Sequence, residues 1–368
     1  MTEHFGGNSG VGRFSGYSLS FMRDAFAMRI FFRKYVRKLD TDHETFDVVA
    51  QSLVVKNRVR WARSVNQWNR QEVLMTTYHH ANVKGRKLFY REAGSKDFPT
   101  IVLLHGFPSS SHMFRDLIPQ LADKIHVIAP DYVGFGYSDA PGVQEFEYTF
   151  DNLAAHVAEL LFGNLGLKRF SIYVQDYGAP VGYRIASKHP DAIPSIVVQN
   201  GNAYVEGIGD GFDAMKPFWA NRNSETEKPV RDLLTKKMTE FQYTHGVKDA
   251  SRISPDSYTL DQLFLDRPGN AAIQLDLLYD YQSNVARYDQ WHAYFRKRQP
   301  GMLIVWGKND PFFTVEGAKA YKRDLPNAEL HLLDTGHFAL EDSSAFIAER
   351  IREFFRSQVL KPAVSSVA

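Results

Sequence analysis

The stretch that decides the fold is Ser171-Ile172-Tyr173-Val174-Gln175-Asp176-Tyr177-Gly178-Ala179. An apolar, β-branched run ends at an acid and small residues follow, which predicts a strand, a sharp turn and the start of a helix. The side chain at the tip of such a turn projects from the sheet edge, above the N–H groups of the helix N-terminus. Here it is Asp176, which is ionised at neutral pH and can attack carbon without a base. An Asp before a helix also serves as a simple N-cap, so the stretch needs support from the rest of the chain.

The composition limits the class of protein. The chain has 368 residues, 44% of them hydrophobic, which is enough for one large domain or two. The formal net charge of +2 gives no reason to expect a nucleic-acid partner. Cysteine is absent, which excludes disulfides and thiolate catalysis and favours a reducing, cytoplasmic location. We expect no secretory signal and no membrane-spanning segment, because neither pattern occurs.

Residues 1–75 are predicted to form an N-terminal helical extension. The first 20 residues are rich in Gly and Ser and indicate a flexible arm. Residues 21–39 combine apolar and basic side chains, and residues 1–39 carry seven Lys/Arg against two acids, a charge of +5. A basic helix of this kind can lie on an anionic membrane or resemble an organelle presequence. Its apolar residues are spread broadly around the helix, which favours packing on the main domain or a second subunit instead. A second helical stretch is expected near residues 44–74.

From residue 76 onward, strand and helix patterns alternate, beginning with a hairpin that closes at Lys84-Gly85. Strands are expected at 76–83, 87–92, 100–104, 125–129, 170–174, 195–199, 302–306 and 329–333, and helices at 112–121, 150–161, 179–188, 315–323 and 344–355. The alternation predicts an α/β fold, with a mostly parallel sheet and helices on both faces. Residues 203–300 interrupt the pattern with a helical, aromatic-rich segment. This predicts a helical cap inserted after the sixth strand of a core formed by 76–202 and 301–360, with a tail at 361–368.

Three further loops carry residues suited to chemistry. His105-Gly106-Phe107-Pro108 follows a strand directly, and a Gly turn there frees backbone N–H groups for an oxyanion hole. Asp310 ends a second apolar strand, and His337 follows a third strand and a glycine. Each alone has an ordinary explanation as a turn or a surface loop. Together with Asp176 they give nucleophile, acid and His in the chain order of the α/β-hydrolase triad.

At this point the sequence resembles the α/β-hydrolase superfamily over residues 76–358. The stretch Pro130-Asp131-Tyr132-Val133-Gly134-Phe135-Gly136-Tyr137-Ser138-Asp139 matches the P-D-x-x-G-x-G-x-S-D pattern of the epoxide hydrolase and haloalkane dehalogenase branch, whose nucleophile is Asp. The resemblance implies a covalent ester on Asp176, which water activated by His337 and Asp310 hydrolyses. It also implies an oxyanion hole from the N–H groups of Phe107 and Tyr177, and neither step needs a metal or cofactor.

The sequence leaves two classes of electrophilic substrate, epoxides and haloalkanes. Val174 before the turn resembles dehalogenases, whereas the His-Gly-Phe-Pro loop resembles epoxide hydrolases. Dehalogenases commonly place Trp after the nucleophile and many place a polar residue at the position of Phe107, but this chain has Tyr177 and Phe107 there. These departures favour hydrolysis of an epoxide to a diol, with haloalkane dehalogenation as the alternative. A carboxylesterase would have Ser at the tip, and a non-catalytic binding protein of this fold would usually have lost a triad residue.

The cap must supply the rest of the pocket. Epoxide opening needs an acid over the ring oxygen, usually a cap tyrosine in the family, and the cap holds seven tyrosines. We expect Tyr243 and Tyr279 to line the pocket, and Trp219 to form its wall or, as an indole donor, to bind a halide. The expected substrate is a small apolar or amphipathic electrophile that reacts with water. The sequence is compatible with a homo-oligomer.

Overall fold

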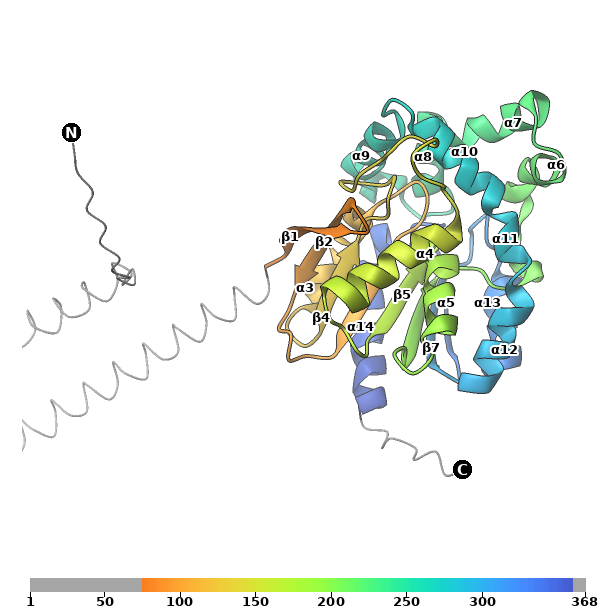
Figure 1. Ribbon diagram of the computed structural model, residues 1–368. Coiled ribbons are helices and arrows are strands. Elements are labelled where there is room, and N and C mark those ends of the chain that lie inside the picture. Colours follow the sequence, from red (N-terminus) through yellow and green to blue (C-terminus); the bar gives the residue numbers. More distant parts are fainter. Residues whose placement is uncertain (1–74, 360–368) are drawn as a thin grey trace, which may run out of the picture. The chain divides into compact units, whose positions relative to one another are not determined.

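Figure 1 shows the fold in a computed structural model, which describes residues 75–359. The predicted extension, apart from its last residue, and the predicted tail lie outside the described residues. The proposed packing of the basic helix therefore stays a prediction. No helix among the described residues is long and apolar enough to cross a membrane.

An eight-stranded sheet forms the centre of the fold, in the order β1-β2-β4-β3-β5-β6-β7-β8. The strand β2 pairs antiparallel with β1 and β4, and all other pairs are parallel. Lys84 and Gly85 close the first hairpin at the predicted place, both at positive φ. The predicted α/β-hydrolase fold is confirmed. The strands are β1 (Thr77–Val83), β2 (Arg86–Ala93), β3 (Thr100–Leu104), β4 (His126–Pro130), β5 (Ser171–Gln175), β6 (Ser195–Gln199), β7 (Gly301–Gly307) and β8 (Glu329–Leu333).

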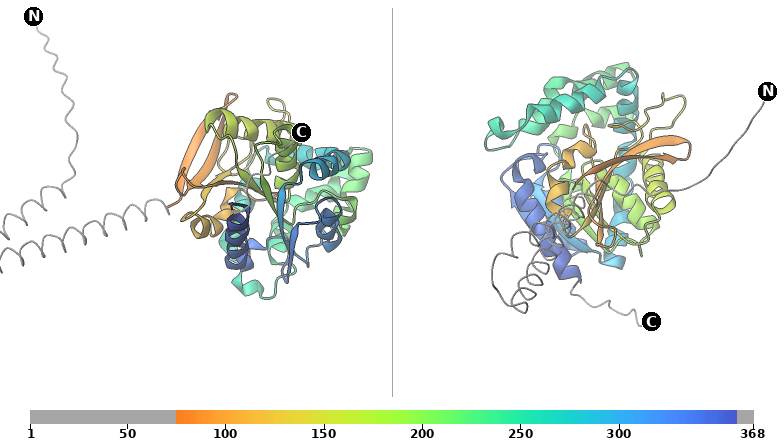
Figure 2. Two further views of the ribbon diagram at one scale, coloured as in Figure 1. Left: turned by 90° about the horizontal axis from the view of Figure 1, so that it is seen from below. Right: turned by 90° about the vertical axis from the view of Figure 1, so that its left-hand side faces the viewer.

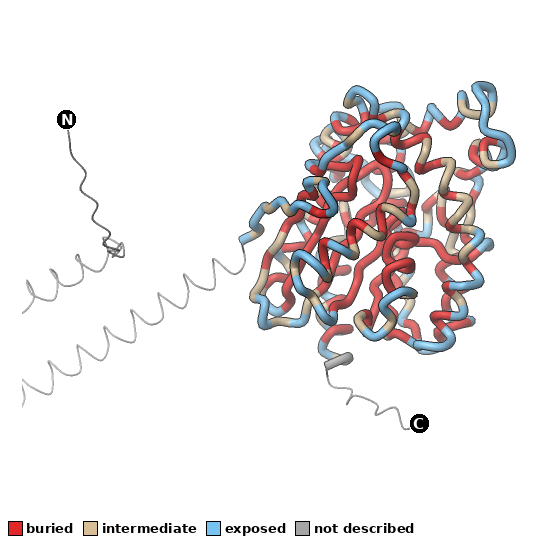
Figure 3. The backbone as a smooth tube through the Cα atoms, viewed as in Figure 1, coloured by how far each residue is buried: buried red, intermediate tan, exposed pale blue. Residues whose placement is uncertain are grey.

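Helices cover both faces of this sheet, as Figure 2 shows. Successive side chains of a strand point to opposite faces, so each central strand supplies two hydrophobic cores. Ile172 and Val174 of β5 belong to one core and Tyr173 to the other. The first core includes side chains of α4 (Phe150–Ala158), α5 (Gly178–Lys188), α12 (Tyr288–Arg298) and α13 (Val315–Asp324). The second includes side chains of α3 (Leu117–Leu121) and α14 (Leu340–Val359). Figure 3 shows the central strands as continuously buried, and the edge strands β1 and β8 are largely exposed or half-buried.

Two predicted helices are less regular than their patterns indicated. The helix expected at 112–121 is divided into a 3-10 turn, Ser111–Phe114, and α3. Ser110 caps that turn by accepting a hydrogen bond from the His112 N–H, which starts the helical segment earlier than expected. The helix expected at 150–161 changes after α4 into a π-helical segment, Glu159–Asn164. Gly163 and Asn164, which are poor helix formers, lie at its end.

The segment between β6 and β7 is helical, as the sequence indicated. It contains α6 (Met215–Ala220), α7 (Ser224–Arg231), α8 (Lys236–Thr244), α9 (Pro255–Leu265), α10 (Asn270–Asp280), α11 (Gln282–Val285) and α12. Figure 1 shows α6 to α10 above the sheet and α12 beside α5. Trp291 of α12 packs edge-on against Tyr183 of α5, with ring centroids 5.3 Å apart. The last helix of the segment therefore belongs to the layer that covers the sheet, and the division into core and cap stays a prediction.

Gly178, at the start of α5, allows a test of the turn between β5 and α5. A Cβ atom on Gly178 would lie 2.1 Å from the Leu104 carbonyl oxygen, closer than any real contact. We expect Gly178→Ala to lower the free energy of unfolding by about 1–3 kcal/mol, because β3 and α5 must separate. Urea unfolding followed by circular dichroism measures this change. Gly142→Ala is the matched control, because its added Cβ meets no atom within 4 Å. Equal stability of the two variants would contradict the close packing of helix and strand.

Candidate active site

Asp176 lies at the tip of the turn between β5 and α5. Its φ of 48° is in the left-handed region, which costs energy for any residue with a side chain. The turn is held by hydrogen bonds from the Asp176 N–H to Asn200 O at 3.2 Å and from the Ala179 N–H to Asp176 O at 3.0 Å. The carboxylate is thus presented at the C-terminal edge of the sheet, with the residue only 7% exposed.

Two backbone N–H groups hold the Asp176 carboxylate. The Phe107 N–H donates to Oδ1 over 2.6 Å, and the Tyr177 N–H also donates to the carboxylate. A Cβ atom on Gly106 would lie 2.6 Å from the same Oδ1, so this approach requires glycine. The two N–H groups expected to form an oxyanion hole therefore both act on the Asp176 carboxylate.

His337 lies between the two carboxylates. Its Nδ1 is 2.7 Å from Asp310 Oδ2, and its Nε2 is 4.0 Å from Asp176 Oδ2. Asp310 is fixed by Asn200 Nδ2, which donates to Oδ2 over 2.8 Å, and by the Phe312 N–H, which donates to Oδ1 over 2.8 Å. All three residues expected to act together are thus brought to one place, on loops after β5, β7 and β8. The arrangement can direct one imidazole nitrogen towards an ester formed on Asp176.

Two glutamines orient His337, and sequence reasoning singled out neither. Gln175 Nε2 lies 2.9 Å from His337 Nε2, and Gln199 Nε2 donates to the His337 carbonyl oxygen over 2.8 Å. An amide that donates to Nε2 leaves the ring proton on Nδ1, where Asp310 accepts it. The only sequence signal was position, because each glutamine ends a buried strand at the catalytic edge.

Burial and hydrogen bonding act in opposite directions on Asp176. Burial raises the pKa of this carboxyl to about 6, although His337 and the N–H groups of Phe107 and Tyr177 lower it. Burial also lowers the pKa of His337, but the negative charge and hydrogen bond of Asp310 more than offset this and raise it above its ordinary value. Asp176 is therefore ionised at neutral pH and more basic than an exposed Asp.

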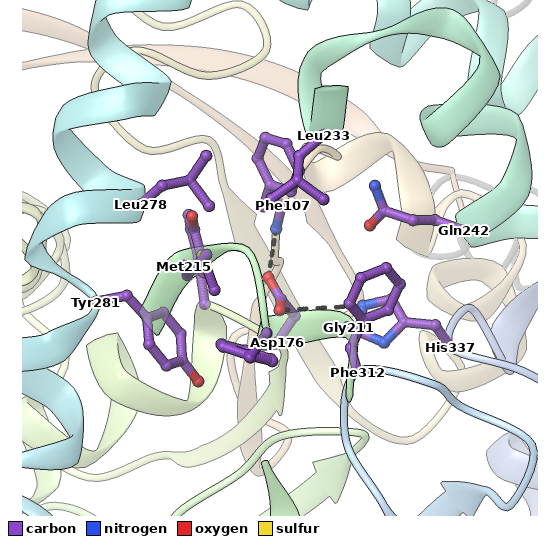
Figure 4. A pocket seen from close by; sticks show the side chains of 12 residues that line it. Phe107, Asp176, Gly211, Met215, Leu233, Gln242, Leu278, Tyr281, Phe312 and His337 are labelled. Atoms are coloured by element: carbon purple, nitrogen blue, oxygen red, sulfur yellow. Dashed lines mark hydrogen bonds and ion pairs between the residues drawn. The ribbon is translucent and has the colours of Figure 1, made fainter. Parts of the chain in front are cut away.

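A cavity lies above the carboxylate (Figure 4). Core and cap both contribute, and the wall is mostly apolar. It is lined by Phe107, Asp176, Tyr177, Gly211, Phe212, Met215, Leu233, Gln242, Leu278, Tyr281, Phe312 and His337. Among residues 75–359, no group of three or more His, Asp or Glu side chains is arranged to hold a metal ion.

The three cap residues expected at the pocket lie elsewhere. Tyr243 is buried, stacks on Phe338 with ring centroids 3.9 Å apart, and donates to Asp261 over 2.5 Å. Tyr279 packs beside Phe218 instead of reaching the cavity. Trp219 donates its indole N–H to Leu278 O over 2.8 Å, so that donor is already used. The expectation fails because a helix turns 100° per residue, and residue type alone does not show which face meets the cavity.

The raised pKa of Asp176 leads to a direct prediction. With ¹³C-labelled aspartate, we expect one carboxyl resonance, absent in Asp176→Asn, to titrate near pH 6. In His337→Gln its midpoint should move to higher pH, because the neighbouring positive charge that lowers the pKa is lost. An Asp176 midpoint near 4, the ordinary value, would contradict the burial of this group.

Comparison with known proteins shows which family the chain belongs to. Residues 99–344 match the family described as the alpha/beta hydrolase fold. An uncharacterized hydrolase of Saccharomyces cerevisiae is 42% identical over 77% of this chain and 98% of its own. Haloalkane dehalogenase 1 of Mycobacterium tuberculosis is 32% identical over 69% of this chain and 82% of its own.

A solved epoxide hydrolase structure superposes with a TM-score of 0.62 at 21% identity, covering 77% of this chain and 99% of that one, which shows the shared fold. The sequence matches and the fold lead to one conclusion. The chain belongs to the α/β-hydrolase fold family, as a hydrolase with relatives among the haloalkane dehalogenases.

Proposed function

We propose that this hydrolase opens a small epoxide to a diol through a covalent ester on Asp176. The observation that carries the proposal is the position of the Asp176 carboxylate between the Phe107 N–H and His337. Its Oδ1 accepts the Phe107 N–H at 2.6 Å, and its Oδ2 lies 4.0 Å from His337 Nε2 at the cavity. Oδ1 is therefore held by the protein, while Oδ2 is left to attack the substrate.

The first step joins Asp176 to the substrate. Asp176 Oδ2 forms a bond to one epoxide carbon, the bond from that carbon to the ring oxygen breaks, and the oxygen takes a proton from a tyrosine hydroxyl. Two tyrosines line the cavity, Tyr177 and Tyr281. Burial raises the pKa of both, so each keeps its proton at neutral pH. The Tyr177 hydroxyl has no hydrogen-bond partner among the described residues and is free to serve as this donor.

The second step removes the ester. His337 Nε2, once the Gln175 amide releases it, takes a proton from water, and the resulting hydroxide attacks the Asp176 Cγ. The negative charge then rests on Oδ1, where the Phe107 N–H already donates, and the Tyr177 N–H acts on the same carboxyl group. Collapse breaks the bond between Cγ and the substrate oxygen, which takes the proton from His337. Asp176 returns to a carboxylate and its proton restores the tyrosine, so the sum is epoxide plus water to diol.

Donor chemistry favours an epoxide over a halide. The resemblance to dehalogenases, which commonly have Trp after the nucleophile, implies an indole N–H on the leaving halide. Here the residue after Asp176 is Tyr177, and the Trp219 N–H is bound to Leu278 O. The lining tyrosines can give a proton to an alkoxide, which a halide does not need. The relatives named haloalkane dehalogenases support the halide as a second candidate.

His337→Gln separates the two steps and the two substrates. Attack by Asp176 needs no base, whereas ester hydrolysis does, so the variant should react once and stall. Intact-mass spectrometry at pH 8 should show the protein plus the whole epoxide mass, and peptide mapping should place the adduct on Asp176. A haloalkane would add its mass less one hydrogen halide. Asp176→Ala should form no adduct with either. No adduct from any epoxide or haloalkane would reject the covalent mechanism.

Asp310→Asn tests how the base is supported. Asn keeps the shape of the side chain but lacks the charge that stabilises protonated His337. We expect ester hydrolysis to slow by about a thousandfold or more, with the ester accumulating in rapid-quench experiments. The matched control is Asp334→Asn, an exposed acid near the His337 loop that pairs with Lys308 and should keep the wild-type rate. Equal rates for the two variants would remove Asp310 from the triad.

A further inference from the structure

One polar side chain of the cavity is not used by the reaction described above. Gln242 of α8 is 4% exposed and lines the cavity together with Asp176 and His337. Figure 4 shows its amide directed into the space above the Asp176 carboxylate. Its Nε2 is fully enclosed and has no hydrogen-bond partner among residues 75–359. A buried amide without a partner is unfavourable, so it indicates a group that a ligand would satisfy.

The neighbours of Gln242 show that this orientation is specific. Thr239 and Tyr243, the other buried polar residues of α8, both turn towards α9. Thr239 donates to Gln262 over 2.8 Å, and Tyr243 donates to Asp261 over 2.5 Å. Gln242 alone among these three turns from α9 to the cavity. The buried polar side chains Thr239 and Tyr243 of α8 therefore form hydrogen bonds with α9, whereas the Gln242 amide faces the cavity.

The other residues that line the cavity limit which groups the Gln242 amide can bind. The cavity wall is mostly apolar, including Leu233, Met215 and Phe312, and the described lining contains no Lys or Arg. His337 already lies between the carboxylates of Asp176 and Asp310, so an anionic substituent would meet Asp176 without a further cation to balance it. A neutral oxygen with a free lone pair, such as an ether or carbonyl, can accept from the amide without that cost.

We infer that Gln242 is a specificity-determining residue that donates to a neutral oxygen of the substrate. The preferred substrates are small amphipathic epoxides that carry an ether or carbonyl oxygen close to the ring, rather than pure hydrocarbon epoxides. This inference rests on the proposed function for its reaction. The hydrogen bond itself concerns a second oxygen, not the one that leaves.

A pair of substrates that differ in one atom tests the inference. Glycidyl propyl ether and 1,2-epoxyheptane have the same length, and a CH₂ group in the second replaces the ether oxygen. We expect kcat/KM of the wild-type enzyme to be about tenfold higher for the ether. In Gln242→Leu the ratio should fall to about one. A ratio taken within one enzyme does not depend on the fraction of folded protein.

The control is Glu240→Leu, which places the same new residue on the exposed face of α8 and should keep the wild-type ratio. No preference in the wild-type enzyme, or an unchanged ratio in Gln242→Leu, would overturn the inference.

A binding measurement separates this inference from the proposed reaction. 2-Hexanone and 2-methyl-1-hexene are unreactive isosteres that differ by a carbonyl oxygen. Ligand-observed NMR should show tighter binding of the ketone to the wild-type protein and about equal binding to Gln242→Leu. If this difference appears but no epoxide is hydrolysed, Gln242 recognition stands and the proposed function fails. If epoxides are hydrolysed but the ketone has no advantage, the proposed function stands and the Gln242 inference fails.

Discussion

The structure depends on a carboxylate kept out of water at the edge of a sheet. Burial penalises the charge of Asp176, and three groups offset the penalty: the N–H groups of Phe107 and Tyr177, and His337. Each comes from a different loop, so the charge is stable only when the ends of β3, β5 and β8 have the correct spacing. The close contact of Gly178 with the β3 carbonyl is a condition for that spacing.

The carboxylate of Asp310 has a different set of hydrogen-bond partners from that of Asp176. Asp310 receives the Phe312 N–H, the Asn200 amide and His337 Nδ1, so its oxygens have polar partners on several sides. Asn200 also donates to Gly307 O and accepts from the Gly307 N–H, which ties the ends of β6 and β7 together. One carboxylate is therefore saturated and fixed, while the other keeps one oxygen open to the cavity. This asymmetry supports the proposed division of roles, with Asp310 as the orienting acid and Asp176 as the nucleophile.

Local signals explain what the sequence could predict. A strand buried on both faces is an apolar run, and a reactive loop at its end is a break in that run, so Asp176, Asp310 and His337 could be found from short windows. The cap could not be resolved in this way. Tyr243 was expected at the cavity, but its neighbour Gln242 lines it instead. The two residues are adjacent on α8, so their side chains point about 100° apart around the helix axis. Only the packing of α8 against α9 decides which of the two meets the cavity, and that contact is set by residues distant in sequence.

The same balance explains why Asp suits this turn. Donors that hold Oδ1 also lower the basicity of the carboxylate and would weaken it as a nucleophile. Burial acts in the other direction, and the net pKa of about 6 leaves Asp176 ionised at neutral pH but more basic than an exposed Asp. In the proposed cycle the Phe107 N–H has one function throughout, because Oδ1 carries charge in the carboxylate and would carry it again in the tetrahedral intermediate. A site already arranged around charge on Oδ1 needs little reorganisation when that charge returns.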